Sequence, residues 1–500
     1  MTDAAVAPPM KKGHPKGLYV LFATEAWERF SYYGMRALLV LYLVNHLEYE
    51  ESDALAVYAT YTGLVYLTPV LGGMFADRYI GARAAVLVGA VVMALGHLAM
   101  AFEPLLFPAL GLLIVGNGFF KPNISTIVGG LYEPGDPRRD GGFTVFYMGI
   151  NLGAFFSPLV CGWLGEKVGW HYGFSAAGVG MVIGLLTFVG LQRFLGTTGW
   201  APDVKDPQPD QRFRAKDWIR VAIYSTASVI FVFGFIELWK LVGPWVESQP
   251  LWLRILIGVL FIGGGVFGPL LLGGKNEDAP KEPFTREDWH RIFVILILGV
   301  FVIFFWMGFE QSGGTMTLFA DQQTDRHLFG WEIPASYFQS INPLAIVVLA
   351  PVFSAMWLRL DSGRFRTSTP TKMALGMIIL GLGFVVLYFA QGLAEGSESG
   401  KVGPFWLAAV YLLHTLGELC LSPIGLSMVT KLSPVRVVSL MMGFWFAFTG
   451  LANYLAGMLE SIVEEFDLNV FATLIASSIG AGLLLLLLTP LLKRWMHGRG

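Results

Sequence analysis

Residues 24–34 read TEAWERFSYYG and lie inside an apolar segment that runs from about residue 17 to residue 45. About 20 consecutive apolar residues are enough for a helix to cross the hydrocarbon core of a bilayer. The segment nevertheless carries four charged residues: Glu25, Glu28, Arg29 and Arg36. Charges within a membrane span are costly and usually functional, so any account of the fold and of the activity has to explain them.

Long apolar segments recur along the whole chain. Of its 500 residues, 55% are hydrophobic and only 14% are charged, a balance that does not suit a soluble domain. Because a helix satisfies its own backbone hydrogen bonds in lipid, such segments predict membrane-spanning helices. We predict fourteen of them, at about residues 17–45, 54–76, 82–101, 105–129, 142–166, 172–195, 217–241, 250–273, 289–320, 332–360, 370–391, 403–431, 436–460 and 469–495.

Lysine and arginine indicate how these segments are oriented. Of the 34 in the chain, 26 lie on the side of the two termini, 5 lie on the opposite side and 3 lie inside spans. Connections in the cytoplasm are enriched in positive charge. We therefore expect both termini in the cytoplasm, in agreement with the even number of spans.

Two connections suggest an internal repeat. The sequence GGMFADRYIGAR follows the second span, and its weaker echo LRLDSGRFR follows the tenth. When the two spans within 217–273 are set aside as an insertion, each connection follows the second helix of a six-helix half, as in many secondary transporters. We predict an all-α polytopic membrane protein with the following parts: a tail at 1–16, a six-helix bundle at 17–195, linkers and an inserted helix pair at 196–288, a second six-helix bundle at 289–495 and a tail at 496–500.

Other kinds of chemistry find little support in the sequence. Cys161 and Cys420 lie in separate spans far apart in the chain, which excludes a disulfide framework. No metal-ligand motif, phosphate-binding lysine loop or nucleophile elbow occurs in its required context, so a membrane-embedded enzyme is disfavoured. We expect no metal and no nucleic-acid partner. A channel stays open as an alternative, which accumulation of a substrate against its gradient would exclude.

Seven charged residues are predicted well inside spans: Glu25, Glu28, Arg29, Arg36, Lys121, Glu310 and Glu418. Each costs about 2.5–3.5 kcal/mol near a helix centre. One interpretation is that they are salt bridges that only hold helices together, above all the adjacent pair Glu28 and Arg29. Well-packed hydrophobic residues often replace buried ion pairs without loss of stability, so we favour a functional role for the charges.

The balance and placement of these charges suggest what they bind. Three cations and four carboxylates leave one negative charge uncompensated, and such a buried carboxylate binds a proton readily near neutral pH. Arg36 and Lys121 belong to the first half of the chain, whereas Glu418 belongs to the second. A ligand with a negative and a positive end would bridge the halves. Two or three extended residues span about 7–10 Å, close to a helix diameter of about 10–12 Å, which suits a short zwitterionic peptide.

The quoted motifs also resemble those of a known family. TEAWERFSYYGMR resembles the ExxERFxYYGMR motif of the proton-dependent oligopeptide transporters of the major facilitator superfamily. GGMFADRYIGAR, GNGFFKPNIS and FTVFYMGINLGAFFSP are similar to further motifs of that family, and the resemblance covers essentially the whole chain. It implies the major facilitator fold with the extra helix pair of bacterial members, in the bacterial inner membrane. The implied activity is proton-coupled import of di- and tripeptides by alternating access.

The resemblance further implies roles for individual residues. Those implied in proton coupling are Glu25, Glu28, Arg29 and Glu310. Those implied in peptide binding are Arg36, Lys121, Glu418, Asn151, Asn342, Tyr33, Tyr66, Trp306, Trp445 and Ser422. Arg36 and Lys121 would face the peptide carboxylate, with Glu310 pairing with one of them when no peptide is bound, and Glu418 would face the amino terminus. For the aromatic residues, ordinary packing is the alternative.

The resemblance also bears on the proton and on the partners. Animal relatives use a histidine in the second span, but this chain has none there, so carboxylates must carry the proton. Peptides and peptide-like drugs are the implied ligands, with protons as the coupling ion, no other cofactor, and a monomer in the bilayer. Transport of nitrate or other small anions on the same fold is the alternative function.

Overall fold

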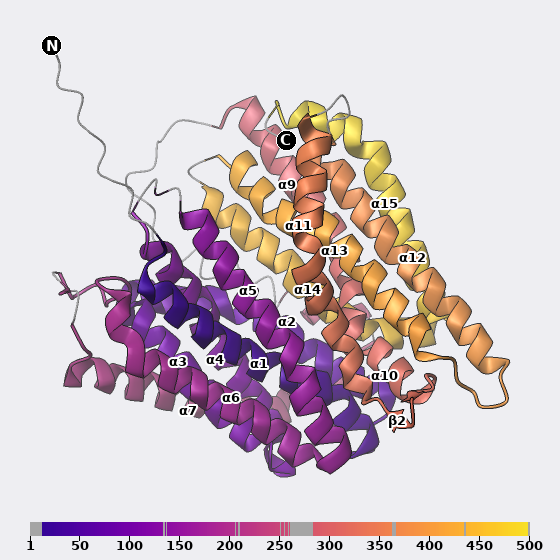
Figure 1. Cartoon of the computed structure of the whole chain (residues 1–500), viewed down its shortest axis with the longest axis horizontal. Helices are drawn as coiled ribbons and strands as arrows, with labels where there is room; N and C mark the ends of the chain where they lie inside the picture. The colour runs from indigo at the N-terminus through magenta and orange to yellow at the C-terminus, as the bar shows by residue number, and fades with distance from the viewer. Residues whose placement is uncertain are drawn as a thin grey trace.

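The computed structural model describes residues 13–133, 136, 138–205, 207–208, 211–250, 252–254, 256–258, 260, 284–362, 367–434 and 437–498. The long helices run back and forth between two faces of the molecule and gather into two bundles (Figure 1). The first bundle contains α1 (Lys16–Asn45), α2 (Glu51–Phe75), α3 (Gly81–Ala99), α4 (Leu106–Gly130), α5 (Arg139–Ser157) and α6 (Trp170–Leu191). The second contains α9 (Arg286–Phe309), α10 (Thr315–Gln322), α11 (Ile341–Ser362), α12 (Thr369–Glu395), α13 (Pro404–Leu432), α14 (Val438–Glu465) and α15 (Val470–Trp495). Between them in the chain, α7 (Ala215–Glu247) packs against α3 and α4.

Within the described part of the chain, eleven helical stretches are long and apolar enough to cross a membrane. One of them, Glu51–Ala99, joins α2 and α3 and so holds two predicted spans. Its chain reverses at Gly81, which has φ +77°, and an added Cβ there would lie 2.4 Å from the nitrogen of Ala201. The predicted first span is α1, whose interior charges set it apart from the eleven. Most of the predicted span at 250–273, the connection at 363–366 and parts of both tails lie outside the described residues.

The second bundle differs from the prediction at its first two spans. The predicted span 289–320 is broken by a 3-10 turn, Glu310–Gly313, between α9 and α10. The predicted span 332–360 corresponds to the helical stretch Ala335–Leu360, whose first part is a 3-10 helix, Ala335–Ser340, that runs into α11. A two-residue hairpin precedes it. The hairpin pairs β1 (His327–Leu328) with β2 (Trp331–Glu332). Phe329 and Gly330 both have positive φ, as a two-residue hairpin turn of type I′ requires.

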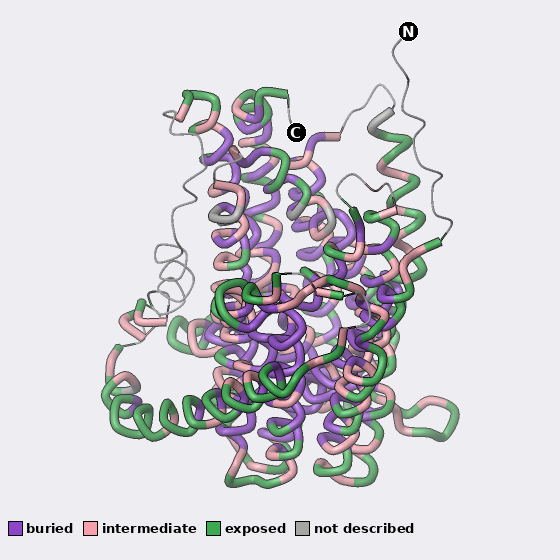
Figure 2. Tube along the Cα trace, turned by 90° about the vertical axis from the view of Figure 1, so that its left-hand side faces the viewer, coloured by how far each residue is buried: buried purple, intermediate pink, exposed green. Residues whose placement is uncertain are grey.

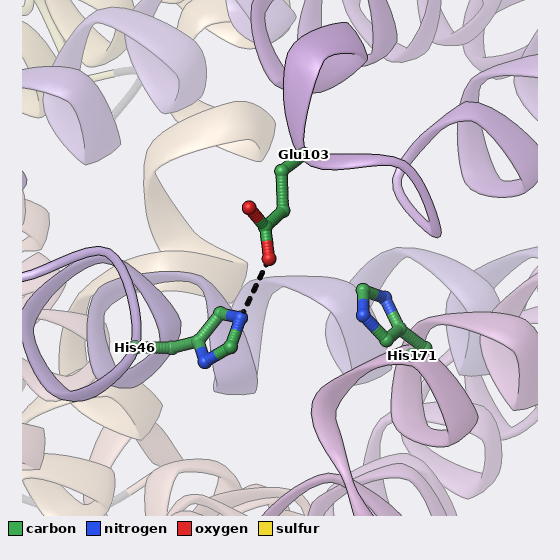
Figure 3. Close-up of side chains that lie close together, drawn as sticks. All are labelled: His46, Glu103 and His171. Carbon is green, nitrogen blue, oxygen red and sulfur yellow. Dashed lines mark hydrogen bonds and ion pairs between the residues drawn. The ribbon is translucent and has the colours of Figure 1, made fainter.

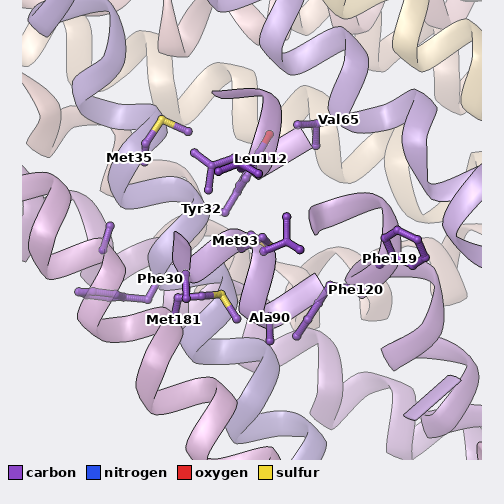
Figure 4. Close-up of a cluster of buried hydrophobic side chains, with 14 of the residues drawn as sticks. Phe30, Tyr32, Met35, Val65, Ala90, Met93, Leu112, Phe119, Phe120 and Met181 are labelled. Carbon is purple, nitrogen blue, oxygen red and sulfur yellow. The ribbon is translucent and has the colours of Figure 1, made fainter. Parts of the chain in front are cut away.

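Each bundle has its own apolar core. Figure 2 shows the buried residues concentrated along the inside of the bundles and the exposed residues along their outer surfaces and connections. In the first bundle the core is built where α1, α3, α4 and α6 meet, through side chains such as Phe30, Met93, Phe120 and Met181 (Figure 4). Exposed apolar residues on helices of this length suit contact with lipid rather than water.

The close packing of α2 against α4 depends on glycine. The hydroxyl of Thr68 on α2 donates a hydrogen bond of 2.9 Å to the carbonyl oxygen of Ile114 on α4. A Cβ added at Gly72 would lie 2.0 Å from the carbonyl oxygen of Gly118. Small residues at such a crossing let two helix backbones approach, which is a common device for helix packing in membranes.

We expect Gly72→Ala to destabilise the protein, because the new methyl group would force α2 and α4 apart. Overpacking of this kind costs about 1–3 kcal/mol. The midpoint of thermal unfolding in detergent is the measurement. Gly234→Ala on α7 is the matched control, since an added Cβ there meets no atom within 4 Å. Equal stability of the two variants would contradict this account of the α2–α4 contact.

Candidate functional site

The charged face of α1 forms one cluster with α4. Lys121 Nζ lies 2.5 Å from Glu25 Oε1, and Arg29 Nε lies 3.5 Å from the same oxygen. Arg29 also binds Glu28 in a bidentate pair at 2.5 and 2.6 Å, and Asn117 Nδ2 lies 3.4 Å from Glu28 Oε1. Both carboxylates are fully buried, whereas the side chain of Lys121 keeps 31% of its surface exposed. Lys121 is therefore the member of the cluster that a ligand could reach.

A second ion pair joins the two bundles. The Nη2 of Arg36 on α1 donates to Glu310 at the end of α9, 274 residues away in the chain. Arg36 Nε also donates to the hydroxyl of Tyr58 on α2 at 2.5 Å. The break between α9 and α10 begins at Glu310, so the carboxylate sits at a change of backbone direction. The Arg36–Glu310 pair must break if the two bundles separate at the depth of these side chains.

Glu418 differs from the other three buried carboxylates. It is 8% exposed, and in the part of the chain that the structure describes no cation pairs with it. Its Oε2 accepts a hydrogen bond of 2.9 Å from Asn342 Nδ2, which also donates to the hydroxyl of Thr415 at 3.0 Å. The uncompensated negative charge expected from the sequence thus falls on Glu418, in the second bundle.

The aromatic candidates are spread over both bundles. Tyr33 is half-buried and has Arg29, Arg36, Glu310 and Glu418 as electrostatic neighbours, so it lies where the charges of the two bundles meet. Tyr66, also half-buried, has Glu310 and Arg36 among its electrostatic neighbours. Both tyrosines therefore lie near the Arg36–Glu310 ion pair.

The two remaining aromatic candidates pack within the second bundle. Trp306 is half-buried and packs edge to face against Phe309. Trp445 is buried, and its ring lies where a Cβ on Gly425 would be.

The two small polar candidates, Asn151 and Ser422, have few described contacts. Asn151 donates to the carbonyl oxygen of Tyr147 on its own helix at 3.0 Å, while Ser422 is a half-buried residue of α13. Their place in a binding site stays a prediction.

Two site residues escaped the sequence analysis. Tyr58 receives a hydrogen bond from Arg36, and Thr415 receives one from Asn342 beside Glu418. Thr415 lies three residues before Glu418 in the same helix, and this spacing places both on one face, which was a usable signal. Nothing in the sequence around Tyr58 indicates its partner, because the contact depends on how α1 and α2 pack.

A network of charges joins the bundles on the face at which α1 ends, which we call the distal face. Glu166 lies in a π-helical turn, Leu164–Val168, that follows α5, and it accepts backbone N–H bonds from Ala335 at 2.7 Å and Ser336 at 3.0 Å. Lys167 binds Glu332 at 2.5 Å. Arg326 lies 3.6 Å from Glu166 and 3.3 Å from Glu332.

This distal network, Glu166, Lys167, Arg326 and Glu332, holds the hairpin of the second bundle against the first. Asn45 extends it, because its side-chain amide donates to Asp321 at 2.8 Å. The pKa of Glu332 lies below its ordinary value, chiefly because of the hydrogen bond from Lys167, so Glu332 stays charged at neutral pH.

Two membrane bundles that enclose buried ion pairs, with opposite charges on facing bundles, are typical of a transporter. The pattern of the POT family matches residues 83–215 and 282–476. The chain belongs to the POT family and is a multi-pass membrane protein of the major facilitator type.

Individual relatives cover nearly the whole chain. It is 37% identical over 508 residues to the peptide transporter YePEPT of Yersinia enterocolitica subsp. palearctica serotype O:3 (strain YE-P4), covering 98% of this chain and 96% of that one. It is 33% identical over 503 residues to a di-/tripeptide transporter of Lactococcus lactis subsp. cremoris, covering 96% of each. A crystal structure of a peptide transporter POT in complex with sulfate superposes with a TM-score of 0.80 at 36% identity, covering 98% of both chains.

Proposed function

We propose that this protein imports di- and tripeptides together with protons by alternating access. The observation that carries the proposal is the division of charge: Lys121 and Arg36 belong to the first bundle, and Glu418, without a cation in the described residues, belongs to the second. The relatives named as peptide and di-/tripeptide transporters support the same substrate class. Peptide-like drugs with the same two charged ends belong to this class.

The charged ends of a bound peptide would supply partners for charges of the protein. Its amino terminus supplies the cation that Glu418 lacks, and its carboxylate competes with Glu25 for Lys121 or with Glu310 for Arg36. Protonation of the displaced carboxylate then removes the charge that would pull the cation back. Binding of peptide and proton therefore favours each other, because each stabilises the state in which the cations are released.

The same exchange couples the peptide to the motion of the bundles. The Arg36–Glu310 pair spans the two bundles, so its loss weakens the contact that holds them together at mid-membrane. Each proton that enters with its charge gains about 2.3 kcal/mol per 100 mV of membrane potential. We further propose that the distal face is extracellular and that both termini are cytoplasmic, in keeping with the distribution of lysine and arginine.

Uptake of labelled dialanine into proteoliposomes tests this function. An inward proton gradient with an inside-negative potential should drive accumulation above the external concentration, and a protonophore should abolish it. Equilibration without accumulation would indicate a channel. Accumulation that is independent of the proton gradient would contradict proton coupling.

Transport of nitrate or other small anions is not favoured. A small anion could bind Lys121 or Arg36, but the uncompensated charge of Glu418 would repel it and would have no role. Competition between dialanine and nitrate in the same uptake assay separates the two functions. Peptide uptake that is insensitive to excess nitrate is the expected result.

Arg326→Ala should shift the protein towards states that are open at the distal face, because it removes the cation between Glu166 and Glu332. Arg326 contacts Glu166 and Glu332 as ion pairs at 3.6 and 3.3 Å. Ion pairs near the surface contribute about 0.2–1 kcal/mol, so the equilibrium should change by up to about fivefold. Distances between spin labels at Glu48→Cys and Ser399→Cys, both exposed on the distal face, measure the shift. The native cysteines are buried and should stay unlabelled.

Arg220→Ala is the matched control, since Arg220 pairs with Asp203 on the opposite, proximal face. It should leave the label distances unchanged.

The pKa of Glu332 in the folded protein lies below its ordinary value of 4.5. Its ion pairs therefore contribute to stability above pH 4.5, and this contribution is lost as the pH falls through the lowered pKa. Acidification from pH 7.5 to 6 should therefore leave the ion pairs of Glu332 intact. Protonation of Glu332 within that range would contradict this assignment.

A further inference from the structure

Three metal-ligating side chains meet on the distal face, away from the transport site. His46 follows α1, Glu103 lies in the 3-10 turn before α4, and His171 is the second residue of α6. One ligand atom from each lies within 4.8 Å of the others, and His46 Nε2 is 2.9 Å from Glu103 Oε1 (Figure 3). Among the residues that the structure describes, this is the only group of three such side chains so close together.

We propose that His46, Glu103 and His171 form a binding site for a divalent transition-metal ion of the zinc class. Two imidazoles and one carboxylate are a ligand set that Zn²⁺ uses, with a fourth position left to water. Metal–ligand distances of about 2.0–2.2 Å place the ligand atoms of a tetrahedral site about 3.4 Å apart. All three side chains are exposed, so rotation about their side-chain bonds is enough to reach this spacing.

A buried aromatic residue packs beside both histidines. The ring of Tyr42 stacks on His46 with 5.2 Å between centroids. The same ring contacts Trp170, the neighbour of His171, at 5.9 Å and Phe174 at 5.1 Å. Tyr42 is a residue of α1, is 1% exposed and packs against α6. Its ring therefore keeps the end of α1, which carries His46, close to the start of α6, which carries His171.

An ordinary hydrogen bond accounts for only part of the cluster. It explains His46 and Glu103, but His171 makes no hydrogen bond within the described residues and still stands edge-on to His46 at 6.3 Å. The other close histidine pair, His290 and His497, has no third ligand of this kind in the described part of the chain. Imidazole ligands favour zinc, copper and nickel, whereas magnesium and calcium prefer sites built of oxygen.

The location of the site limits what a bound ion can do. All three ligands belong to the first bundle, so an ion would join the end of α1 to the starts of α4 and α6 without linking the two bundles. It should stabilise the first bundle and leave alternation between the bundles free. Ligand binding to the folded state alone raises stability by mass action, which gives a readout independent of transport.

The test is titration of the full chain, stripped of metal by a chelator and freed of any polyhistidine tag, with Zn²⁺ in detergent. One ion should bind per chain, and the midpoint of thermal unfolding should rise as Zn²⁺ is added. Loss of even an outer partner of a metal site costs about 10- to 100-fold in affinity. The double variant His46→Ala/His171→Ala, which loses two direct ligands, should therefore bind at least about 100-fold more weakly.

Two further variants separate this site from surface binding. Glu103→Gln can still hydrogen-bond to His46 but is a much poorer metal ligand, so it should lose affinity while keeping the unfolding midpoint of the metal-free protein. His327→Ala is the matched control, because His327 contacts Asp325 on the distal face without a third ligand. It should bind Zn²⁺ as the unchanged protein does. Absence of binding in the unchanged protein, or equal affinity in the double variant, would overturn the proposal.

Discussion

Glu418→Gln should reduce gradient-driven dialanine uptake by about 10- to 100-fold or more. Glutamine keeps the size of the side chain and can still accept from Asn342, but it removes the negative charge that would bind the peptide amino terminus. Hydrogen bonds to charged groups contribute about 1.5–3 kcal/mol, which corresponds to this range of affinity. Initial uptake rates in proteoliposomes, together with dipeptide binding by calorimetry, measure the effect.

The expected pattern for Glu418→Gln is loss of transport in a protein that is at least as stable as before. A buried carboxylate without a cation is unfavourable, so its removal should not lower the unfolding midpoint. Glu237→Gln on α7 is the matched control, since Glu237 pairs with Lys240 outside the two bundles. It should transport normally. Full accumulation of dialanine by Glu418→Gln would remove the main support for the proposed function.

Lys121→Ala should abolish uptake and also destabilise the protein. Its loss deprives the buried Glu25 of its 2.5 Å partner and leaves only Arg29 at 3.5 Å. Removal of one partner of a buried ion pair costs about 3–5 kcal/mol, and the partial exposure of Lys121 reduces that figure. The peptide carboxylate loses one of its two cations at the same time. Uptake rates and the unfolding midpoint are both measured.

A double variant distinguishes the two effects. Lys121→Ala/Glu25→Gln removes the stranded negative charge and should recover most of the lost stability, but it should not recover transport. Lys240→Ala on the exposed surface of α7 should change neither quantity. Recovery of uptake in the double variant would show that Lys121 acts only by holding helices together.

Much of the candidate site follows from helical periodicity. The 3.6-residue repeat of α1 places Glu25, Glu28, Arg29 and Arg36 on one face, and the structure buries that face between the helices. The pairing of Glu28 with the adjacent Arg29 is equally local. The helical segments could be predicted because long apolar stretches in a membrane have few alternatives to a helix.

The pairing between helices could not be derived in this way. Lys121 binds Glu25 across 96 residues, and Arg36 binds Glu310 across 274. The resemblance left Glu310 with either Arg36 or Lys121. The choice depends on which helices are neighbours and at what depth each charge lies. The start of α11 at Ile341 also escaped prediction, because the hairpin before it is held by tertiary contacts from Glu166 and Lys167.

The sequence by itself determined most of the membrane spans, the charged face of α1 and the excess of one buried carboxylate, because these depend on composition and on the repeat of a helix. Only the tertiary structure decided that the excess charge is Glu418, that Tyr58 and Thr415 belong to the site, and that two histidines and Glu103 meet on the distal face. The physical reason is that a helix's own repeat fixes which residues share a face, whereas packing between helices fixes which faces meet.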